Sequence, residues 1–200
     1  LPTWLRFVKG VIDSSDLPLN VSREILQQNR VMSKIKSNSV KKVLDKIKTI
    51  SKNKDKYEGF YNEFGRLLKE GVYQEFEHKE ALTELLRFKS TKEEGFVSLQ
   101  DYLDRMSSDQ ESIYYITGTN ESALRDSPLL EMYKEKDIEV LILDDEIDEI
   151  IMPSIPTFKE KSLKSVNRSG AADELNKDSD KDKKEELKPL IKKVKSVLGD

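Results

Sequence analysis

The sequence contains no cysteine, only one histidine and only one tryptophan among its 200 residues. Without cysteine the chain has no disulfide framework and no thiol chemistry, so we expect it to work in a reducing compartment. The histidine, His78, stands among Glu75, Glu77 and Glu80. No second histidine or cysteine completes a metal-ligand set, which favours a surface histidine over a metal site.

Long apolar runs are also absent. No stretch reaches the roughly 18 apolar residues that a membrane-spanning helix needs, and the first residues do not form a signal peptide. The sequence begins at Leu1 without an initiating methionine. We therefore expect a piece of a longer protein that is soluble and cytoplasmic, with no membrane partner.

Neither sign of charge dominates: 35 basic and 38 acidic residues give a formal net charge of −3, which argues against nucleic acid as a partner. Charged and hydrophobic residues each make up 36%, a balance that favours long solvated helices and a disordered stretch.

The sequence T-G-T-N at 117–120 lacks the glycine spacing and the lysine of a phosphate loop. With no nucleophile–base pair either, the sequence does not predict a self-contained enzyme.

One stretch carries an unusual local feature. In L-P-L-N-V-S-R-E-I-L-Q-Q-N-R, from Leu17 to Arg30, Pro18 favours a turn and either Asn20 or Ser22 can cap the helix that follows. Arg23 then lies in the first helical turn, beside the positive end of the helix dipole, at a cost of up to about 1 kcal/mol. Two explanations remain open: a nearby carboxylate or water offsets the charge, or the helix start and the guanidinium receive a phosphate.

The amino-acid sequence of this stretch resembles that of a known family. The block L-R-F-V-K-G-V-I-D-S-S-D-L-P-L-N-V-S-R-E-I-L-Q-Q-N, from Leu5 to Asn29, closely resembles the middle domain of the 90-kDa heat-shock chaperones. The likeness resumes, in the order of the family, at Ala81–Thr91, Ile113–Gly118 and Ile138–Glu149. It covers about three quarters of the chain, and the first block is long and specific.

The resemblance implies a catalytic role for the first block. In the family, the arginine of N-V-S-R-E reaches the γ-phosphate of ATP held in a separate N-terminal domain, and a nearby asparagine and glutamine belong to the same loop. By position these residues are Arg23, Asn20 and Gln27. ATP and its Mg²⁺ would be bound mainly by the N-terminal domain, so we expect no cofactor in this chain alone and no activity of its own.

The resemblance also implies partners: the N-terminal ATPase domain of the same protein, unfolded client proteins and co-chaperones. The full-length protein would be a homodimer, and this chain by itself a monomer or weakly self-associating. An alternative from another class is a non-catalytic scaffold for protein interactions. Arg23 separates the two hypotheses, because a scaffold has no need of it.

We expect an α/β fold. It would contain the truncated end of a larger α/β/α subdomain with the catalytic loop and a long helix, then a helical connector, and then a small α/β/α subdomain with a parallel sheet of three strands. A charged linker and the first helix of a C-terminal dimerisation domain would follow. The corresponding segments are 1–52, 53–110, 111–167, 168–183 and 184–200.

Local patterns predict most of the elements. Trp4–Ile12 is rich in β-branched residues and predicts a strand. The helix from Ser22 carries six lysines that predict a solvated face, and an aromatic stripe from Tyr57 predicts a core helix that stops at Gly71. Buried strands are predicted at Ile113–Thr117 and Ile138–Leu143, a third strand at Ser162–Val166, and caps at Ser98 with Asp101 and at Ser127 before Pro128.

Two further positions have alternative interpretations. The acidic cluster at 144–149 either opens a helix, which the dipole favours, or forms a Mg²⁺ site. The carboxyl edge of the predicted sheet, where α/β folds place ligands, would present residues 117–120 together with Asp144 and Asp145.

Overall fold

The computed structural model describes residues 1–13, 30–168 and 175. The helices are η1 (Thr3–Leu5), α2 (Arg30–Ile50), α3 (Lys54–Gln74), α4 (Lys79–Leu85), α5 (Leu99–Arg105), α6 (Glu121–Arg125), η2 (Pro128–Leu130), α7 (Glu131–Glu135), α8 (Glu146–Ile151) and η3 (Met152–Ser154). The strands are β1 (Lys89–Ser90), β2 (Ser112–Thr117), β3 (Val140–Leu143), β4 (Thr157–Phe158) and β5 (Lys161–Ser165). The α/β class is confirmed.

The strands form one sheet of five strands in the order β1-β3-β2-β5-β4. Its three central strands are parallel, as predicted, with Tyr115 of β2 opposite Leu141 of β3 and Ser165 of β5. The two edge strands, β1 and β4, are antiparallel and only two residues long, and the sequence did not predict them. Strand β1 belongs to the segment that was expected to be a helical connector.

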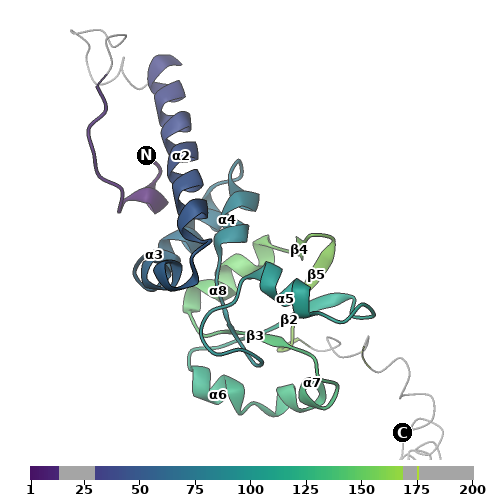
Figure 1. Ribbon diagram of the computed structural model, residues 1–200. Coiled ribbons are helices and arrows are strands. Elements are labelled where there is room, and N and C mark those ends of the chain that lie inside the picture. The colour runs from purple at the N-terminus through teal and green to yellow at the C-terminus, as the bar shows by residue number, and fades with distance from the viewer. Residues whose placement is uncertain (14–29, 169–174, 176–200) are drawn as a thin grey trace, which may run out of the picture.

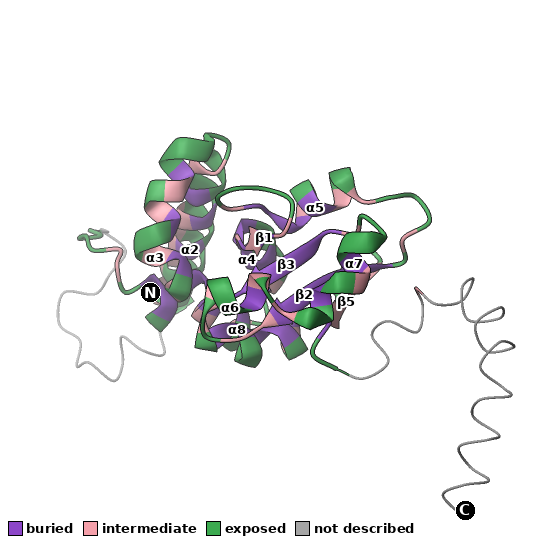
Figure 2. Cartoon of the chain, turned by 90° about the horizontal axis from the view of Figure 1, so that it is seen from below, coloured by how far each residue is buried: buried purple, intermediate pink, exposed green. Residues whose placement is uncertain are grey.

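Alternate residues of the strands face two different cores, because successive side chains of a strand point to opposite faces. Leu141 and Leu143 join the larger core, which also takes in α3, α4 and α8. Tyr114 and Ile116 join a smaller core with residues of α6 and α7. In Figure 1, α6 and α7 lie on the opposite side of the sheet from α3, α4 and α8. Figure 2 shows that β2 and β3 are buried between these layers.

The helical part contains two corrections. The predicted strand at Trp4–Ile12 is wrong: Trp4 and Leu5 lie in a 3₁₀ turn after Pro2, and residues 8–13 pair with no strand among the described residues. Gly71 does not stop its helix either, because α3 continues to Gln74. The ring of Trp4 packs on Gly71, and both residues are buried.

The local capping signals are confirmed. Ser98 and Asp101 form a reciprocal capping box at the start of α5, and the Ser127 side chain accepts a hydrogen bond from the Leu129 N–H in front of η2. The aromatic stripe of α3 is a core face, as predicted: Tyr57, Tyr61 and Leu68 are buried.

Candidate functional site

The predicted catalytic residues Asn20, Arg23 and Gln27 lie outside the described residues. The structure describes the two segments that flank them, namely residues 1–13, here called the N-terminal arm, and helix α2. Figure 1 shows the arm running beside α2, so that its last described residues lie near the end of α2 where Arg30 begins the helix. These two segments are the described parts of the fold that adjoin the predicted catalytic loop in the sequence.

The arm is anchored through its apolar residues. Trp4 and Leu5 are completely buried in the larger core. Phe7 stacks on Phe64 of α3 with ring centroids 4.6 Å apart, and meets Phe60 edge-on at 5.8 Å. Aromatic pairs in such arrangements stabilise beyond the area that they bury. The first half of the arm is thus fixed on α3.

A charge pair adds to this anchor. The guanidinium of Arg6 donates two hydrogen bonds to the carboxylate of Glu70, at 2.5 and 2.9 Å. These bonds from Arg6 hold the pKa of Glu70 below its usual value, so that the carboxylate stays charged as the pair requires. Because Glu70 belongs to α3, the charge pair and the aromatic contacts fasten the arm to the same helix.

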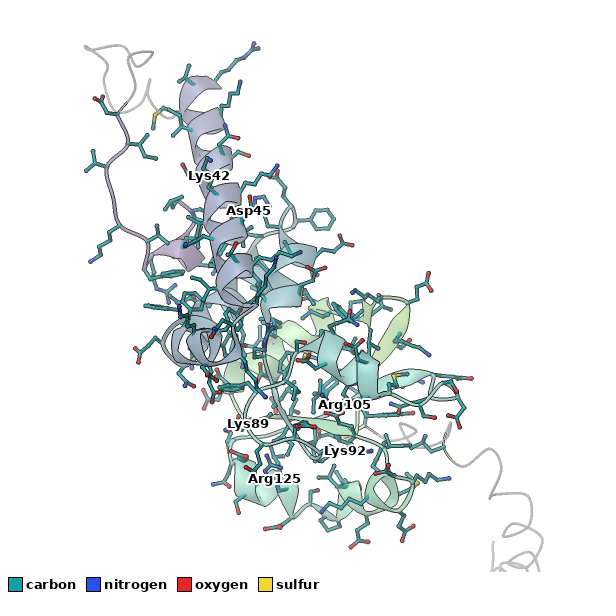
Figure 3. The ribbon with its side chains drawn as sticks, in the orientation of Figure 1. Lys42, Asp45, Lys89, Lys92, Arg105 and Arg125 are labelled. Carbon is teal, nitrogen blue, oxygen red and sulfur yellow. The ribbon has the colours of Figure 1, made fainter. Side chains whose placement is uncertain are left out.

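Helix α2 is fixed by three buried residues, Val40, Leu44 and Ile47, on its inner face. Lys48 forms an ion pair with Glu84 at 2.7 Å that links α2 to α4. The six lysines of α2 are exposed, as predicted for a solvated face, and Figure 3 shows Lys42 and Asp45 on this helix.

A cleft of about 700 Å³ separates the second half of the arm from α2. Val8 and Gly10 line it on the arm, and Ser39 and Val43 line it on the helix. Beyond Val8 the arm leaves the core, and Val11 is 96% exposed. The arm is therefore firmly held at Trp4–Val8 and open to further contacts at residues 9–13.

The carboxyl edge of the sheet, expected to hold ligands, is occupied by the chain's own side chains. Asn167 follows β5 and accepts a hydrogen bond from the Thr117 N–H at 2.9 Å, while its amide donates to the Thr117 carbonyl at 3.2 Å. Lys89 forms ion pairs of 2.7 Å with both Glu121 and Asp144. Hydrogen bonds from Lys89 and Arg125 lower the pKa of Glu121. Asn167 thus links the ends of β2 and β5, and Lys89 links β1 to α6 and to the residue that follows β3.

The acidic cluster at 144–149 opens α8, as one of the two interpretations predicted. The Asp145 side chain caps the helix by accepting from the Ile147 N–H. Asp148 is 1% exposed and its carboxylate lies 2.7 Å from the ammonium of Lys69 on α3. Burial raises the pKa of Asp148, and Lys69 opposes that rise. No group of three or more metal-binding side chains occurs among the described residues.

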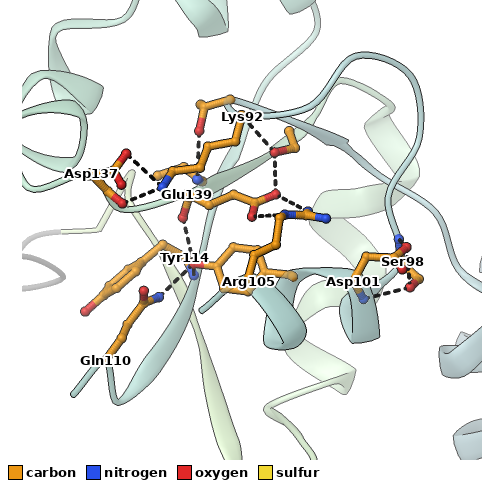
Figure 4. A network of polar contacts seen from close by, with 12 residues as sticks. Lys92, Ser98, Asp101, Arg105, Gln110, Tyr114, Asp137 and Glu139 are labelled. Carbon is orange, nitrogen blue, oxygen red and sulfur yellow. Dashed lines mark hydrogen bonds and ion pairs between the residues drawn. The ribbon is translucent and has the colours of Figure 1, made fainter. Parts of the chain in front are cut away.

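A second buried carboxylate, Glu139, ties β3 to its neighbours (Figure 4). It accepts hydrogen bonds from Arg105 at 2.6 and 3.0 Å and from the hydroxyl of Ser90. The Tyr102 hydroxyl donates to the Glu139 carbonyl at 2.6 Å, and burial raises the pKa of Tyr102 to about 12. Because the partners of Glu139 come from β1 and α5, the network holds these elements to the sheet.

Comparison with known proteins identifies the chain. The family model described as "Hsp90 protein" matches residues 1–200. The chain belongs to the Hsp90 family. It is similar to the "Chaperone protein HtpG" of Treponema denticola, with 55% identity, and to that of Borrelia garinii subsp. bavariensis, with 51%. Both alignments cover 100% of this chain and 33% of the relative, so the chain spans about a third of the length of these relatives.

The blocks that carried the resemblance to the Hsp90 family correspond to parts of the fold described above. Ala81–Thr91 contains most of α4 and all of β1, and Ile113–Gly118 contains most of β2. Ile138–Glu149 contains β3 and the start of α8. The first block, Leu5–Asn29, begins in the arm and ends just before α2, and its catalytic part lies outside the described residues.

Two ion pairs of this Hsp90-family chain were not predicted from the sequence. Arg6 and Glu70 are 64 residues apart, and Lys69 and Asp148 are 79 residues apart. Helical spacing finds partners three or four residues apart, so it gives no signal for either pair.

Among the described helices, none is long and apolar enough to cross a membrane.

Proposed function

We propose that the chain is the middle portion of an ATP-dependent molecular chaperone, in which Arg23 contacts the γ-phosphate of ATP and Asn20 and Gln27 belong to the same loop. The observation that carries the proposal is the sequence N-V-S-R-E at 20–24, inside a chain that matches the Hsp90 family over its whole length. The names of the relatives describe them as chaperones.

The chemistry of an arginine suits this role. Bound ATP, held with Mg²⁺ mainly by the N-terminal domain, would supply the phosphoryl group. A guanidinium offers several fixed donors and remains charged at any physiological pH, so Arg23 would stabilise the negative charge that develops on the γ-phosphate. Arginines that act in this way contribute about 10³-fold or more to the rate.

The anchoring of the flanking segments supports the proposal. The arm at Trp4–Val8 and α2 at Val40–Ile47 both pack on the core that includes α3, and Figure 1 shows the last described residues of the arm near the end of α2 where Arg30 begins the helix. Arg23 would then reach the nucleotide only when the N-terminal domain docks on this end. Hydrolysis would thereby be coupled to closure of the two domains.

We propose further that the full-length protein is a cytoplasmic homodimer, that unfolded client proteins bind to it, and that co-chaperones modulate it. In the homodimer the segment 184–200 would begin the C-terminal dimerisation domain. These proposals rest on membership of the Hsp90 family.

The test is the ATPase rate of the full-length protein with Arg23→Ala or Arg23→Lys. Both variants should lower the catalytic rate about 10³-fold, because a lysine cannot reproduce the planar fork of donors, and both should leave the affinity for ATP nearly unchanged. Arg30→Ala is the matched control, because Arg30 is an exposed arginine at the start of α2, seven positions after Arg23 in the sequence.

A folded Arg23→Ala variant that hydrolyses ATP as fast as the control would refute the catalytic role. It would leave the interaction scaffold as the remaining hypothesis. Circular dichroism of each variant, compared with the wild type, establishes that the variant is folded.

A further inference from the structure

A groove of about 770 Å³ lies between α4 and the turn before β4. One wall is formed by residues from Phe76 to Glu84, and the other by residues from Ser154 to Glu160. We call it the α4–β4 groove. Its volume lies within the range of about 300–1,000 Å³ that is typical of ligand pockets.

An exposed aromatic ring stands at this groove. Phe76 follows the end of α3 and is 96% exposed, in contrast to Trp4, which is completely buried. Within the described part of the chain, Phe76 belongs to neither hydrophobic core. The opposite wall adds the exposed Pro156, whereas Ile155 beside it belongs to the larger core. A large apolar side chain beside a polar-rimmed hollow is the kind of anchor that binding surfaces use.

Acidic side chains outnumber basic ones along the groove. Four carboxylates line it, against two lysines, Lys79 and Lys159. One of the carboxylates, Glu84, already pairs with Lys48, and the ammonium of Lys159 donates to the side chain of Gln100. The remaining three carboxylates have no ion pair among the described residues; they are Glu77, Glu80 and Glu160.

The exposed ring of Phe76 and the unpaired carboxylates together indicate which ligand the groove can bind. An apolar side chain can pack on Phe76 and Pro156, and lysine or arginine side chains beside it can reach the three unpaired carboxylates. Exposed charges attract ligands over about a Debye length, so the interaction weakens as salt is added. An acidic or purely polar peptide would be repelled or would leave the ring exposed.

We propose that the α4–β4 groove binds unfolded client segments in which large apolar residues are flanked by lysine or arginine. The inference rests on the proposed chaperone function, and it specifies where such a client binds and which sequences it prefers. Binding through one aromatic anchor and exposed charges is weak and reversible, as the release of a client requires.

The experiment measures the binding of fluorescent peptides to the full-length protein without nucleotide. The probe is a short peptide in which lysine alternates with leucine and phenylalanine, and its counterpart has glutamate in place of lysine. Fluorescence anisotropy should detect only the lysine probe, with a dissociation constant that rises with salt. Phe76→Ser should weaken its binding about tenfold, because the ring is the apolar anchor.

Glu80→Lys should weaken binding about fivefold and reduce the dependence on salt, because it removes an attraction and adds a repulsion. The matched controls are Leu129→Ser and Glu135→Lys, since Leu129 is 50% exposed and Glu135 is exposed on α7, across the sheet from the groove. Both should bind the probe like the wild type. The substituted side chains are exposed, so circular dichroism should show unchanged folding.

Other outcomes would overturn the proposal. They are equal binding of the two probes, no binding by the wild type, or equal losses in Phe76→Ser and Leu129→Ser. A peptide with the sequence of residues 184–200 that binds more tightly than the probe, in a manner lost in Phe76→Ser, would assign the groove to this chain's own segment. Self-association of the 200-residue chain that is lost in Phe76→Ser would assign it to a second copy.

The two proposals fail separately. Probe binding is measured without ATP, so Arg23→Ala should retain it even where the ATPase rate is lost. A protein that needs Arg23 for hydrolysis but does not bind the probe would refute the groove and leave the proposed function intact.

Discussion

Gly71 is the residue on which the arm depends most directly. A Cβ atom at this position would lie 2.9 Å from Cδ2 of Trp4 and 3.0 Å from Cδ1 of Leu82. Trp4 is completely buried, so its rigid ring has no space into which to move. The absent side chain of Gly71 is therefore what lets the arm lie flat on α3.

We predict that Gly71→Ala destabilises the protein. Overpacking of a filled core costs about 1–3 kcal/mol, which exceeds the gain of up to about 1 kcal/mol from replacing a helical glycine with alanine. The measurement is urea unfolding, together with the emission of Trp4, the one tryptophan, which should shift to the red.

Gly59 is the control on the same helix, because nothing lies within 4 Å of its hypothetical Cβ atom. Gly59→Ala should stabilise the protein by about 0.5–1 kcal/mol. Two substitutions of the same chemistry should thus have opposite signs. Equal effects at the two positions would contradict the packing of Trp4 on Gly71.

The role of Gly71 could not be predicted from the sequence. A glycine near the end of an apolar pattern is a good stop signal, and by that rule α3 should end at Gly71. A glycine is also the residue that lets two segments approach closely, and here this second requirement applies. The partner, Trp4, is 67 positions earlier in the chain, where no local pattern relates the two residues.

At the scale of elements, α3 and α8 are joined across the larger core by a buried ion pair. The ammonium of Lys69 and the carboxylate of Asp148 are 9% and 1% exposed. Asp145 approaches the same ammonium at 3.6 Å. Removing a charge from water is costly, so each partner is tolerated in the core only because of the other.

We predict that Lys69→Met costs about 3–5 kcal/mol of the free energy of unfolding, because it leaves the carboxylate of Asp148 buried without its partner. The double substitution Lys69→Met with Asp148→Leu should recover most of this loss, since apolar residues can replace a buried ion pair. Chemical denaturation of the two variants checks both statements.

Arg66→Met serves as the control, because Arg66 pairs with Asp145 at 3.3 Å and its side chain is 61% exposed. Exposed pairs contribute little, so this substitution should cost less than about 1 kcal/mol. If Lys69→Met and Arg66→Met cost the same, Asp148 does not depend on Lys69 as the geometry indicates.

Elements with a local signal were predictable from the sequence, and elements without one were not. The capping box of Ser98 and Asp101 and the apolar central strands β2 and β3 depend on neighbouring residues, and all are present. Strands β1 and β4 have two residues each, too few for an alternating pattern to be visible. The candidate catalytic residues Asn20, Arg23 and Gln27 remain predictions, because they lie outside the described residues.

At the scale of the whole molecule, the larger core runs through most of the described chain. It begins at Trp4 in the arm, passes through α2, α3 and the sheet, and includes Phe158 of β4. Strand β1 belongs to the expected segment 53–110 and pairs with β3, which belongs to the expected segment 111–167, so the pair crosses the expected boundary at residue 110. Contacts of the larger core and of the sheet therefore cross this boundary.

We therefore predict that the helical part and the sheet unfold in a single transition. Leu141 is completely buried in β3, and Leu141→Ala should cost about 2–5 kcal/mol because it leaves a cavity in the larger core. Trp4 lies at the far end of that core, so the midpoint of urea unfolding should fall equally whether Trp4 emission or far-UV circular dichroism is followed. A Trp4 transition that Leu141→Ala leaves in place would instead show that the segments 53–110 and 111–167 unfold separately.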